Sequence, residues 1–272
     1  MTISAAERPA PGAGVPNQFD VIRSEWRKFR TVRSSFWSLT VATVLAVGLG
    51  ALISLAASTH YDKLSASDRL SWDPAAVSTS GLGLGQLAIG VLGVLIVSSE
   101  FSSGLIQMSV AAVPRRGRLL LAKAFVFGIV SLVVGEILSF LAFGVGQAII
   151  HSNAPSAGLG DRDVLRAVIG SGLYLAALGV LSVAIAAIVR NAAAGIAILV
   201  AVLFVLPGVA AALPSNLEHS VEKFWPTQAG QQITSVYRSA HTLSPWAGFG
   251  WMCLIIAAVF AIAWAVMEKR DV

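Results

Sequence analysis

The sequence predicts an all-α polytopic membrane protein with six transmembrane helices, and its composition and apolar windows both support this fold class. Of its 272 residues, 56% are hydrophobic and only 12% are charged, whereas soluble domains carry about 25% charged residues. The mean hydropathy is +0.77. Several windows reach the length of about 20 apolar residues that spans the hydrocarbon core of a bilayer. A soluble fold is therefore excluded.

The chain divides into a short tail and one membrane domain. Residues 1–18 are rich in Ala, Pro and Gly and predict a disordered tail, whereas residues 19–272 are expected to form one six-span transmembrane domain. The first apolar window is longer than a signal-peptide core and begins well after the N-terminus, so we interpret it as a retained span. Only Arg190 and Asn191 separate the fourth and fifth windows, which predicts a tight helical hairpin. The apolar windows place the six spans at about 36–58, 80–99, 119–150, 164–189, 192–212 and 246–267.

Ahead of the first span, residues 19–36 predict an amphipathic helix in the inner headgroup layer. Its apolar residues recur at steps of three and four: Phe19, Ile22, Trp26, Phe29, Val32 and Phe36. Asp20 is suited to cap the start of the helix, and the polar side carries Arg23, Arg27 and Arg30. Two interpretations fit this segment. It is either a basic anchor for the first span or an elbow helix that moves with the spans, with functional positions at Trp26, Arg27, Phe29 and Arg30.

The distribution of Lys and Arg predicts the orientation of the spans. With an even number of spans, both termini lie on one side of the membrane. That side carries 13 of the 19 Lys and Arg residues, and the other side carries six. The positive-inside rule therefore places both termini in the cytoplasm. The net charge of +5 reflects this orientation, and nucleic-acid binding is a poor explanation for it.

A polar, basic segment at residues 98–123 interrupts the apolar windows and falls on the cytoplasmic side. Ser102 or Ser103 is suited to cap a short helix that runs to about residue 112, and Pro114 ends it. Such a helix presents an apolar ridge of the kind that docks into a groove on a partner. The alternative is a plain loop whose arginines only set the topology. The ridge consists of Phe101, Leu105, Met108 and Ala112.

Two sequence motifs resemble those of a known transporter family. Ser-Ser-Glu-Phe-Ser-Ser-Gly-Leu-Ile at 98–106 and Ala-Ala-Val-Pro-Arg-Arg-Gly-Arg at 111–118 resemble the cytoplasmic loop of type-2 ATP-binding-cassette (ABC) exporter permeases. Residues 24–34 resemble the segment before the first span in actinobacterial members. The resemblance implies a coupling helix at about 100–110, seated in a cleft of a separate ATP-binding subunit. It implies these interface residues: Glu100, Phe101, Ser103, Gly104, Leu105, Ile106, Met108, Pro114, Arg115 and Arg116.

The resemblance also implies a function and partners. The chain is expected to be a permease subunit in the bacterial plasma membrane that exports an amphipathic, drug-like or lipid-like substrate and pairs with a second, identical or related permease subunit. The sequence contains no G-x-x-x-x-G-K-[ST] phosphate loop, so ATP and Mg are expected on a separate ATPase chain and the permease itself is not an enzyme. The four histidines lack the spacing of metal ligands, so no metal or directly bound cofactor is expected.

Two further features are candidates for the translocation path. Residues 213–245 are the longest polar stretch on the outer side, for which the resemblance implies short external helices and a gate that includes Trp225; a solvated cap is the alternative. Glu136 is the only acidic residue deep within a span, where an ionisable group is costly and often functional. Gln147 and Tyr174 are its candidate partners. Glu136 has either a substrate or gating role, a neutral packing role, or, in an alternative function, the coupling role in an ion- or proton-driven secondary transporter.

Overall fold

The computed structural model describes residues 17–31, 33–105, 116–210, 212, 214–237 and 241–269. Within these ranges the chain is helical and contains no strand, and six helices are long and apolar enough to cross a membrane. The predicted all-α, six-span fold class is therefore confirmed, and each predicted span end lies within three residues of the observed one. Of the predicted disordered tail, residues 1–16 lie outside the described part of the chain.

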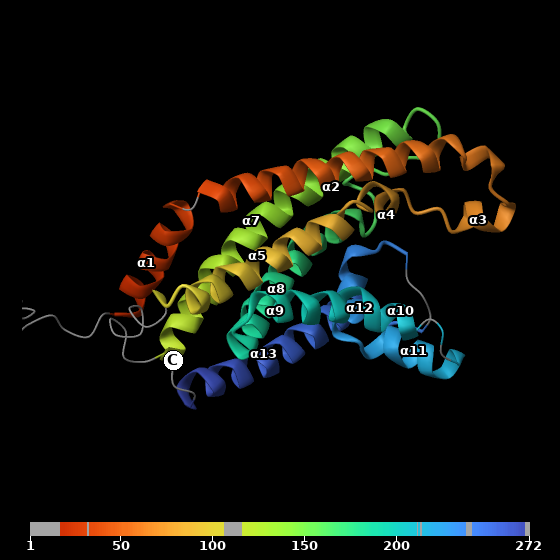
Figure 1. Cartoon of the computed structure of the whole chain (residues 1–272). Coiled ribbons are helices and arrows are strands. Elements are labelled where there is room, and N and C mark those ends of the chain that lie inside the picture. The colour runs from red at the N-terminus through yellow and green to blue at the C-terminus, as the bar shows by residue number, and fades with distance from the viewer. Residues whose placement is uncertain are drawn as a thin grey trace, which may run out of the picture.

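The long helices run roughly side by side through the molecule (Figure 1). They are α1 (Gln18–Thr31), α2 (Arg33–Thr59), α5 (Leu82–Ser102), α7 (Arg116–Ile150), α8 (Val164–Val189) and α13 (Pro245–Lys269). The fifth span consists of α9 (Ala192–Val200), the π-helical turn η2 (Ala201–Val205) and α10 (Leu206–Ala210). The short helices are η1 (Tyr61–Lys63), α3 (Ala66–Leu70), α4 (Pro74–Ser78), α11 (Ser215–Phe224), α12 (Pro226–Gln231) and η3 (Gln232–Thr234).

The two ends of this bundle differ in what they carry. Figure 1 shows α1 at the same end as the C-terminus of α13, and we call this the α1 end. The opposite end carries α3, α4, α11 and α12, and we call it the α12 end. The short helices between the fifth and sixth spans were predicted, and they are present as α11, α12 and η3.

Helix α8 is the centre of the bundle and the most buried of the six spans. It packs against α7, α5 and α13. Its small residues let neighbouring backbones approach closely, as is common where helices pack in membranes: Gly172, Gly179, Ala184, Ala186 and Ala187 are all fully or largely buried. In contrast, α2 and α13 leave large apolar side chains such as Leu52 and Leu254 exposed, as a lipid-facing helix does.

Two local predictions about helix ends can be compared with the structure. The hairpin between the fourth and fifth spans is as tight as predicted, because Arg190 adopts a left-handed conformation with φ of 59° and Asn191 caps α9 by accepting a hydrogen bond from the Ala194 N–H. Pro207 does not end the fifth span but lies inside α10. It has no N–H to donate, and the turn before it is π-helical.

Gly81 and Gly85 allow close helix packing within this chain. A Cβ on Gly81 would overlap the Ala46 carbonyl of α2, and a Cβ on Gly85 would overlap the Leu138 side chain of α7. The Gly-x-x-x-Gly pattern at the start of the second span thus joins α5 to two neighbouring helices of the same molecule.

We therefore expect Gly81→Ala to destabilise the fold by about 1–3 kcal/mol, because the new methyl group meets backbone that cannot move aside easily. A lower midpoint of thermal unfolding in detergent would show this. Gly83→Ala is the matched control, since no atom lies within 4 Å of a Cβ at that position. Equal midpoints for the two variants would contradict the observed packing.

Candidate functional site

A buried cluster of charges joins three helices at the α1 end. The Lys123 Nζ of α7 lies 2.7 Å from Glu25 Oε2 of α1 and 2.6 Å from Glu100 Oε1 of α5. The Lys123 side chain is only 3% exposed. Lys28 lies at the rim, with its Nζ 2.7 Å from Glu25 Oε1 and 3.3 Å from Glu100 Oε1. We call these four residues the Lys123 cluster; its two carboxylates and two ammonium groups balance in charge.

Electrostatics explain why these residues stay together. Burying an isolated charge costs free energy. Removing one partner of a buried ion pair destabilises a protein far more than replacing the whole pair by apolar residues. Desolvation lowers the pKa of Lys28, but the hydrogen bonds and charges of Glu25 and Glu100 outweigh it and raise that pKa above its ordinary value. The remaining oxygen, Glu100 Oε2, is buried and has no hydrogen-bond partner among the described residues.

Helix α1 reaches the cluster through a face that differs from the predicted one. Val21 and Glu25 are buried, Phe29 packs against the main core, and Gln18 donates a hydrogen bond from Nε2 to the Arg118 carbonyl. The apolar residues predicted to share one face are divided between the protein and its surroundings: Phe29 packs on the core, whereas Phe19 (69%) and Trp26 (40%) are exposed, as a face in the headgroup layer would be.

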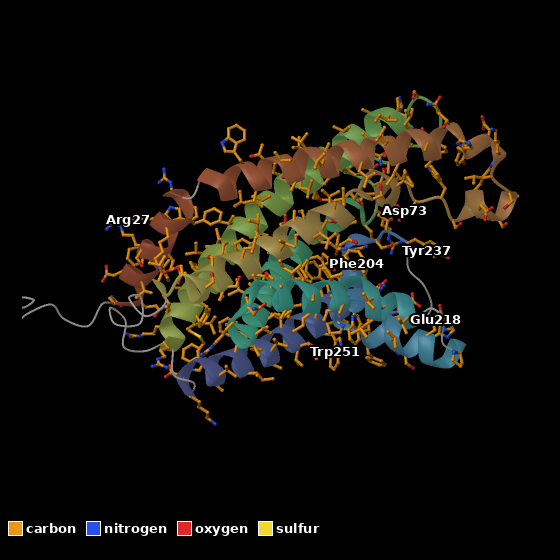
Figure 2. The ribbon with its side chains drawn as sticks, in the orientation of Figure 1. Arg27, Asp73, Phe204, Glu218, Tyr237 and Trp251 are labelled. Atoms are coloured by element: carbon orange, nitrogen blue, oxygen red, sulfur yellow. The ribbon has the colours of Figure 1, made fainter. Side chains whose placement is uncertain are left out.

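The polar side of α1 lies outside the cluster. Arg27 and Arg30 are exposed, and Figure 2 shows Arg27 projecting away from the helices. Val32 and the side chain of Phe36 lie outside the described part of the chain. Glu25 is thus the acidic residue through which α1 joins the Lys123 cluster, beside the contacts of Gln18, Val21 and Phe29.

The segment after α5 begins directly beside the cluster. Ser102 is the last residue of α5, and Ser103 is its C-cap, with Oγ donating to the Ser99 carbonyl at 2.7 Å. The prediction that either serine caps the start of the next helix is therefore wrong: a serine hydroxyl bonds equally well to a carbonyl one turn back. Gly104 then adopts a φ of 72°, a conformation that suits glycine.

The other predicted interface residues are distributed as follows. Phe101 lies in α5 and packs against the core. The Arg190 guanidinium carbon lies over its ring, 5.1 Å from the ring centroid. The predicted place of Phe101 on an exposed ridge is therefore wrong, whereas Leu105 is 52% exposed. Arg116 is the first residue of α7. Four predicted interface residues lie outside the described ranges: Ile106, Met108, Pro114 and Arg115.

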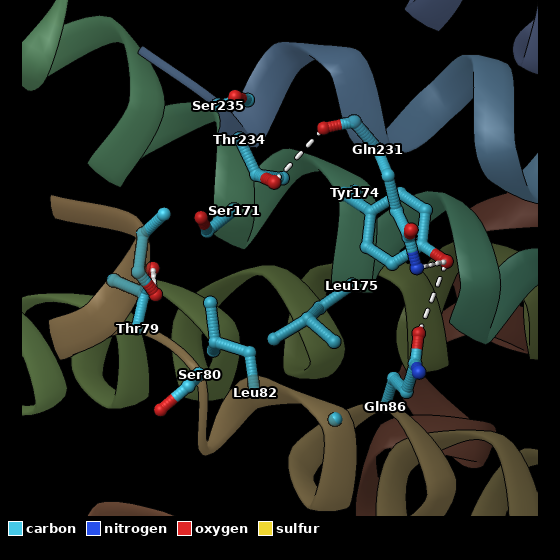
Figure 3. A pocket seen from close by; sticks show the side chains of 12 residues that line it. Thr79, Ser80, Leu82, Gln86, Ser171, Tyr174, Leu175, Gln231, Thr234 and Ser235 are labelled. Carbon is cyan, nitrogen blue, oxygen red and sulfur yellow. Dashed lines mark hydrogen bonds between the residues drawn. The ribbon is translucent and has the colours of Figure 1, made fainter. Parts of the chain in front are cut away.

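A pocket of about 210 Å³ with a mixed polar and apolar lining lies at the α12 end. Its centre is a chain of hydrogen bonds: the Gln231 Nε2 donates to the Tyr174 hydroxyl at 3.3 Å, and this hydroxyl donates to Gln86 Oε1 at 3.0 Å (Figure 3). Three separate elements supply these residues, namely α5, α8 and α12. The rest of the lining is Ala76, Thr79, Ser80, Leu82, Gly83, Ser171, Leu175, Thr234 and Ser235.

The residues predicted for a translocation path lie elsewhere. Gln147 holds the α12 end together: its Nε2 donates to the Pro74 carbonyl and the Ser78 hydroxyl, both at 2.8 Å, and its Oε1 accepts from the Ala157 N–H. The Trp225 Nε1 donates to the Val202 carbonyl at 2.9 Å, within the π-helical turn of the fifth span. Neither side chain lines the pocket.

Glu136 lies against the α8 backbone. A Cβ on Gly172 would overlap its carboxyl group, and its Oε2 is buried without a hydrogen-bond partner among the described residues. The expectation that Gln147 or Tyr174 pairs with Glu136 is wrong, because both bond to other groups. In this conformation the Glu136 carboxyl group packs against Gly172 of α8.

Sequence reasoning missed most of these central residues. Lys123 entered only as a topology signal, and Glu25, Gln86 and Gln231 were given no role. A signal for Glu25 exists in the sequence: it is a lone carboxylate on the helix face that also carries Val21 and Phe29. No comparable pattern singles out Gln86 or Gln231.

Comparison with known proteins identifies the family to which this chain belongs. A family model described as "ABC-2 family transporter protein" matches residues 21–208, which run from α1 to α10 and include the Lys123 cluster. The chain belongs to the ABC-2 transporter family. A comparison with curated proteins finds no significant match. As an ABC-2 permease, the chain is a multi-pass membrane subunit that is not itself catalytic, and its family implies partnership with an ABC ATP-binding subunit on which ATP and Mg act.

Removing the central cation of the cluster should destabilise the α1 end strongly. We expect Lys123→Met to cost about 3–5 kcal/mol, because the two buried carboxylates of Glu25 and Glu100 would be left with one shared counter-charge, Lys28 at the rim. Thermal unfolding in detergent measures this change.

The control is Lys269→Met, which removes an exposed charge at the same end and should change stability little. The triple variant Glu25→Gln/Glu100→Gln/Lys123→Met should recover much of the loss, since it leaves no buried charge. A Lys123→Met protein as stable as the Lys269→Met protein would show that the cluster does not hold the helices together.

Proposed function

We propose that this chain is the permease of an ATP-driven exporter in the bacterial plasma membrane. A separate ATP-binding subunit supplies the energy, and a second permease subunit, identical or related, completes the pathway. The substrate is amphipathic, either drug-like or lipid-like. The observation that carries this proposal is the Lys123 cluster, because it joins α1, α5 and α7 at the base of the segment on which the ATPase is expected to act.

The cluster is suited to transmit force from this segment. Gly104 lies only four residues after Glu100 in the sequence, and Arg116 begins the helix that carries Lys123 two turns later. The segment between them, 105–115, is the proposed docking site, with Leu105 exposed at its start. A displacement of this segment pulls on α5 and α7 at once, and the Glu25–Lys123 pair makes α1 follow.

The α1 end is the cytoplasmic end in this proposal. The excess of Lys and Arg on that side supports it through the positive-inside rule. Exposed Arg27 and Arg30 on α1, with Trp26 beside them, suit a helix that lies among lipid headgroups. The residues that precede α1 in the sequence are then cytoplasmic too.

The α12 end is the proposed exit. The Trp225 Nε1 and the Thr227 hydroxyl both donate to the Val202 carbonyl, which ties α12 to the π-helical turn of the fifth span. On the other side, Gly230 and Gly248 allow α12 to pack closely on α13. A movement of either span therefore moves α12, which supports a gate more than a passive solvated cap.

The test of energy coupling is to identify what purifies with the chain. From native membranes in mild detergent, we expect an ABC ATPase subunit to copurify and to hydrolyse ATP in the reconstituted complex. Gly104→Val should abolish this association or lower ATP turnover about tenfold, because φ of 72° strongly disfavours a β-branched residue.

Gly144→Val is the matched control, since a Cβ there also meets nothing within 4 Å but φ is not positive. A chain that purifies alone, with transport that survives ATP depletion, would contradict ATP coupling.

A variant of Glu136 distinguishes this proposal from the alternative, an ion- or proton-coupled carrier. The observation that supports the carrier is the buried Glu136 oxygen without a partner among the described residues. If Glu136 only packs against Gly172, Glu136→Gln should keep at least about half of the ATP-driven transport, because the amide has nearly the same shape. Transport into inverted vesicles, with and without a protonophore, measures this. Loss of transport in Glu136→Gln together with sensitivity to the protonophore would favour the carrier.

A further inference from the structure

The pocket at the α12 end has hydrogen-bonding capacity that the protein itself does not use. We infer that it binds the uncharged, hydroxyl-bearing headgroup of an amphipathic molecule, such as a single sugar ring. The inference rests on the proposed function, because it names the substrate class of that permease. Four observations carry it: unpartnered polar groups, the absence of lining charges, the pocket size and the origin of the lining residues.

The first observation is a deeply buried amide with an unused donor. Gln86 is only 5% exposed, and its Oε1 accepts from Tyr174. Its Nε2 makes no hydrogen bond to a described residue and is not one of the polar atoms sealed from solvent, so this donor is open to the pocket. Gln231 uses only its Nε2, which leaves its Oε1 as an acceptor. The pocket therefore offers both donors and acceptors to a ligand (Figure 3).

The second observation is that none of the lining residues is charged. The nearby cation Arg166 is already occupied, since its Nη1 and Nη2 donate to the carbonyls of Ile233 and Ser235 at 2.9 and 3.0 Å. A charged headgroup would lose its water here without gaining a counter-charge, which is costly. Hydroxyl groups suit the pocket better, because each one both donates and accepts.

The third observation is size. A volume of about 210 Å³ holds about seven waters at roughly 30 Å³ each. Pockets for whole drug-sized molecules measure about 300–1,000 Å³. This pocket therefore holds a headgroup of about one sugar ring, and the apolar part of the molecule must lie outside it. Leu82 and Leu175 form apolar walls against which the carbon face of a ring can pack.

The fourth observation links binding to release. Gln86, Tyr174 and Gln231 lie on α5, α8 and α12, so the pocket keeps its shape only while these three elements stay together. A shift of α12 breaks the bond between Gln231 and Tyr174 and separates the groups that hold the headgroup. The same movement that opens the proposed exit thus lowers the affinity of the pocket.

The experiment uses the full chain in phosphatidylcholine nanodiscs and photoreactive octyl β-D-glucoside, with a diazirine on the alkyl carbon next to the sugar. Two probes with the same alkyl diazirine carry a phosphate or a trimethylammonium head instead. We expect the glucoside to label peptides that contain 76–87 and 231–235 about tenfold more than either charged probe. Competition by methyl β-D-glucoside distinguishes a soluble sugar from a membrane amphiphile as the source of the headgroup. Strong competition means that the sugar binds the pocket without an alkyl chain.

Filling the pocket provides the decisive variant. Gly83 lines it, and no atom lies within 4 Å of a Cβ there, so Gly83→Phe places a ring in the pocket without a clash at its first carbon. We expect Gly83→Phe to lower glucoside labelling about tenfold. Gly144→Phe, in equally open space on α7, should label like the natural chain. Tyr174→Phe removes one hydroxyl with little change of shape and should lower labelling even if Gly83→Phe proves unstable.

Equal labelling by all three probes, labelling confined to other peptides, or labelling unchanged by both Gly83→Phe and Tyr174→Phe would overturn the inference. The measurement needs no ATPase. Failure here therefore leaves the copurification of an ATPase subunit untouched, and failure of copurification leaves glucoside binding untouched.

Discussion

Lys123 is a positive charge placed inside a bundle that has very few charges to offer, and much of the α1 end follows from how it is neutralised. The only described acids within reach lie on two other helices: Glu25 on α1 and Glu100 on α5. Satisfying one ammonium group therefore fixes where α1 lies and how α5 is aligned along α7. Because a buried charge without its partner is so costly, these three helices must move together or not at all. Gly104 follows Glu100 by only four residues, so the end of α5 lies beside this rigid point.

The α12 end is held together by a different kind of interaction. There, neutral side chains bond to backbone carbonyls: Gln147 to Pro74, Trp225 to Val202, and Arg166, the one charged member, to Ile233 and Ser235. Each such bond contributes only about 0.5–1.5 kcal/mol net, so this end can rearrange at a far lower cost than the Lys123 cluster. Helix α8 runs between the two ends, with Tyr174 in the pocket and Arg190 stacked on Phe101. A rigid α1 end and an adaptable α12 end suit the proposed transporter, which would receive force at the first end and release its substrate at the second.

Local sequence rules were least reliable for residues that can make good interactions in more than one structural position. Ser102 and Ser103 are good N-cap residues, yet they end α5, because a serine hydroxyl also bonds to the carbonyl one turn back. The apolar residues of α1 obey helical spacing, yet only part of them is buried, since Glu25 has to face Lys123. Glu136 and Gln147 are polar residues within apolar windows, which is a reason to suspect function in each. The structure gives one a packing position against Gly172 and the other a structural set of hydrogen bonds.

The sequence by itself determined the class of the protein, the number of spans with their approximate ends, and the tight hairpin at Arg190; the short helices before the last span were expected from the family resemblance. These properties are local: hydrocarbon demands about 20 apolar residues in a row, and left-handed or capped turns depend on a few adjacent residues. Only the tertiary structure decided that Glu25, Glu100 and Lys123 form one cluster, and that Gln86, Tyr174 and Gln231 enclose one pocket. These residues are far apart in the chain, and no spacing rule relates them. Their chemistry arises from the way whole helices pack side by side, because packing decides which polar groups must find one another away from water.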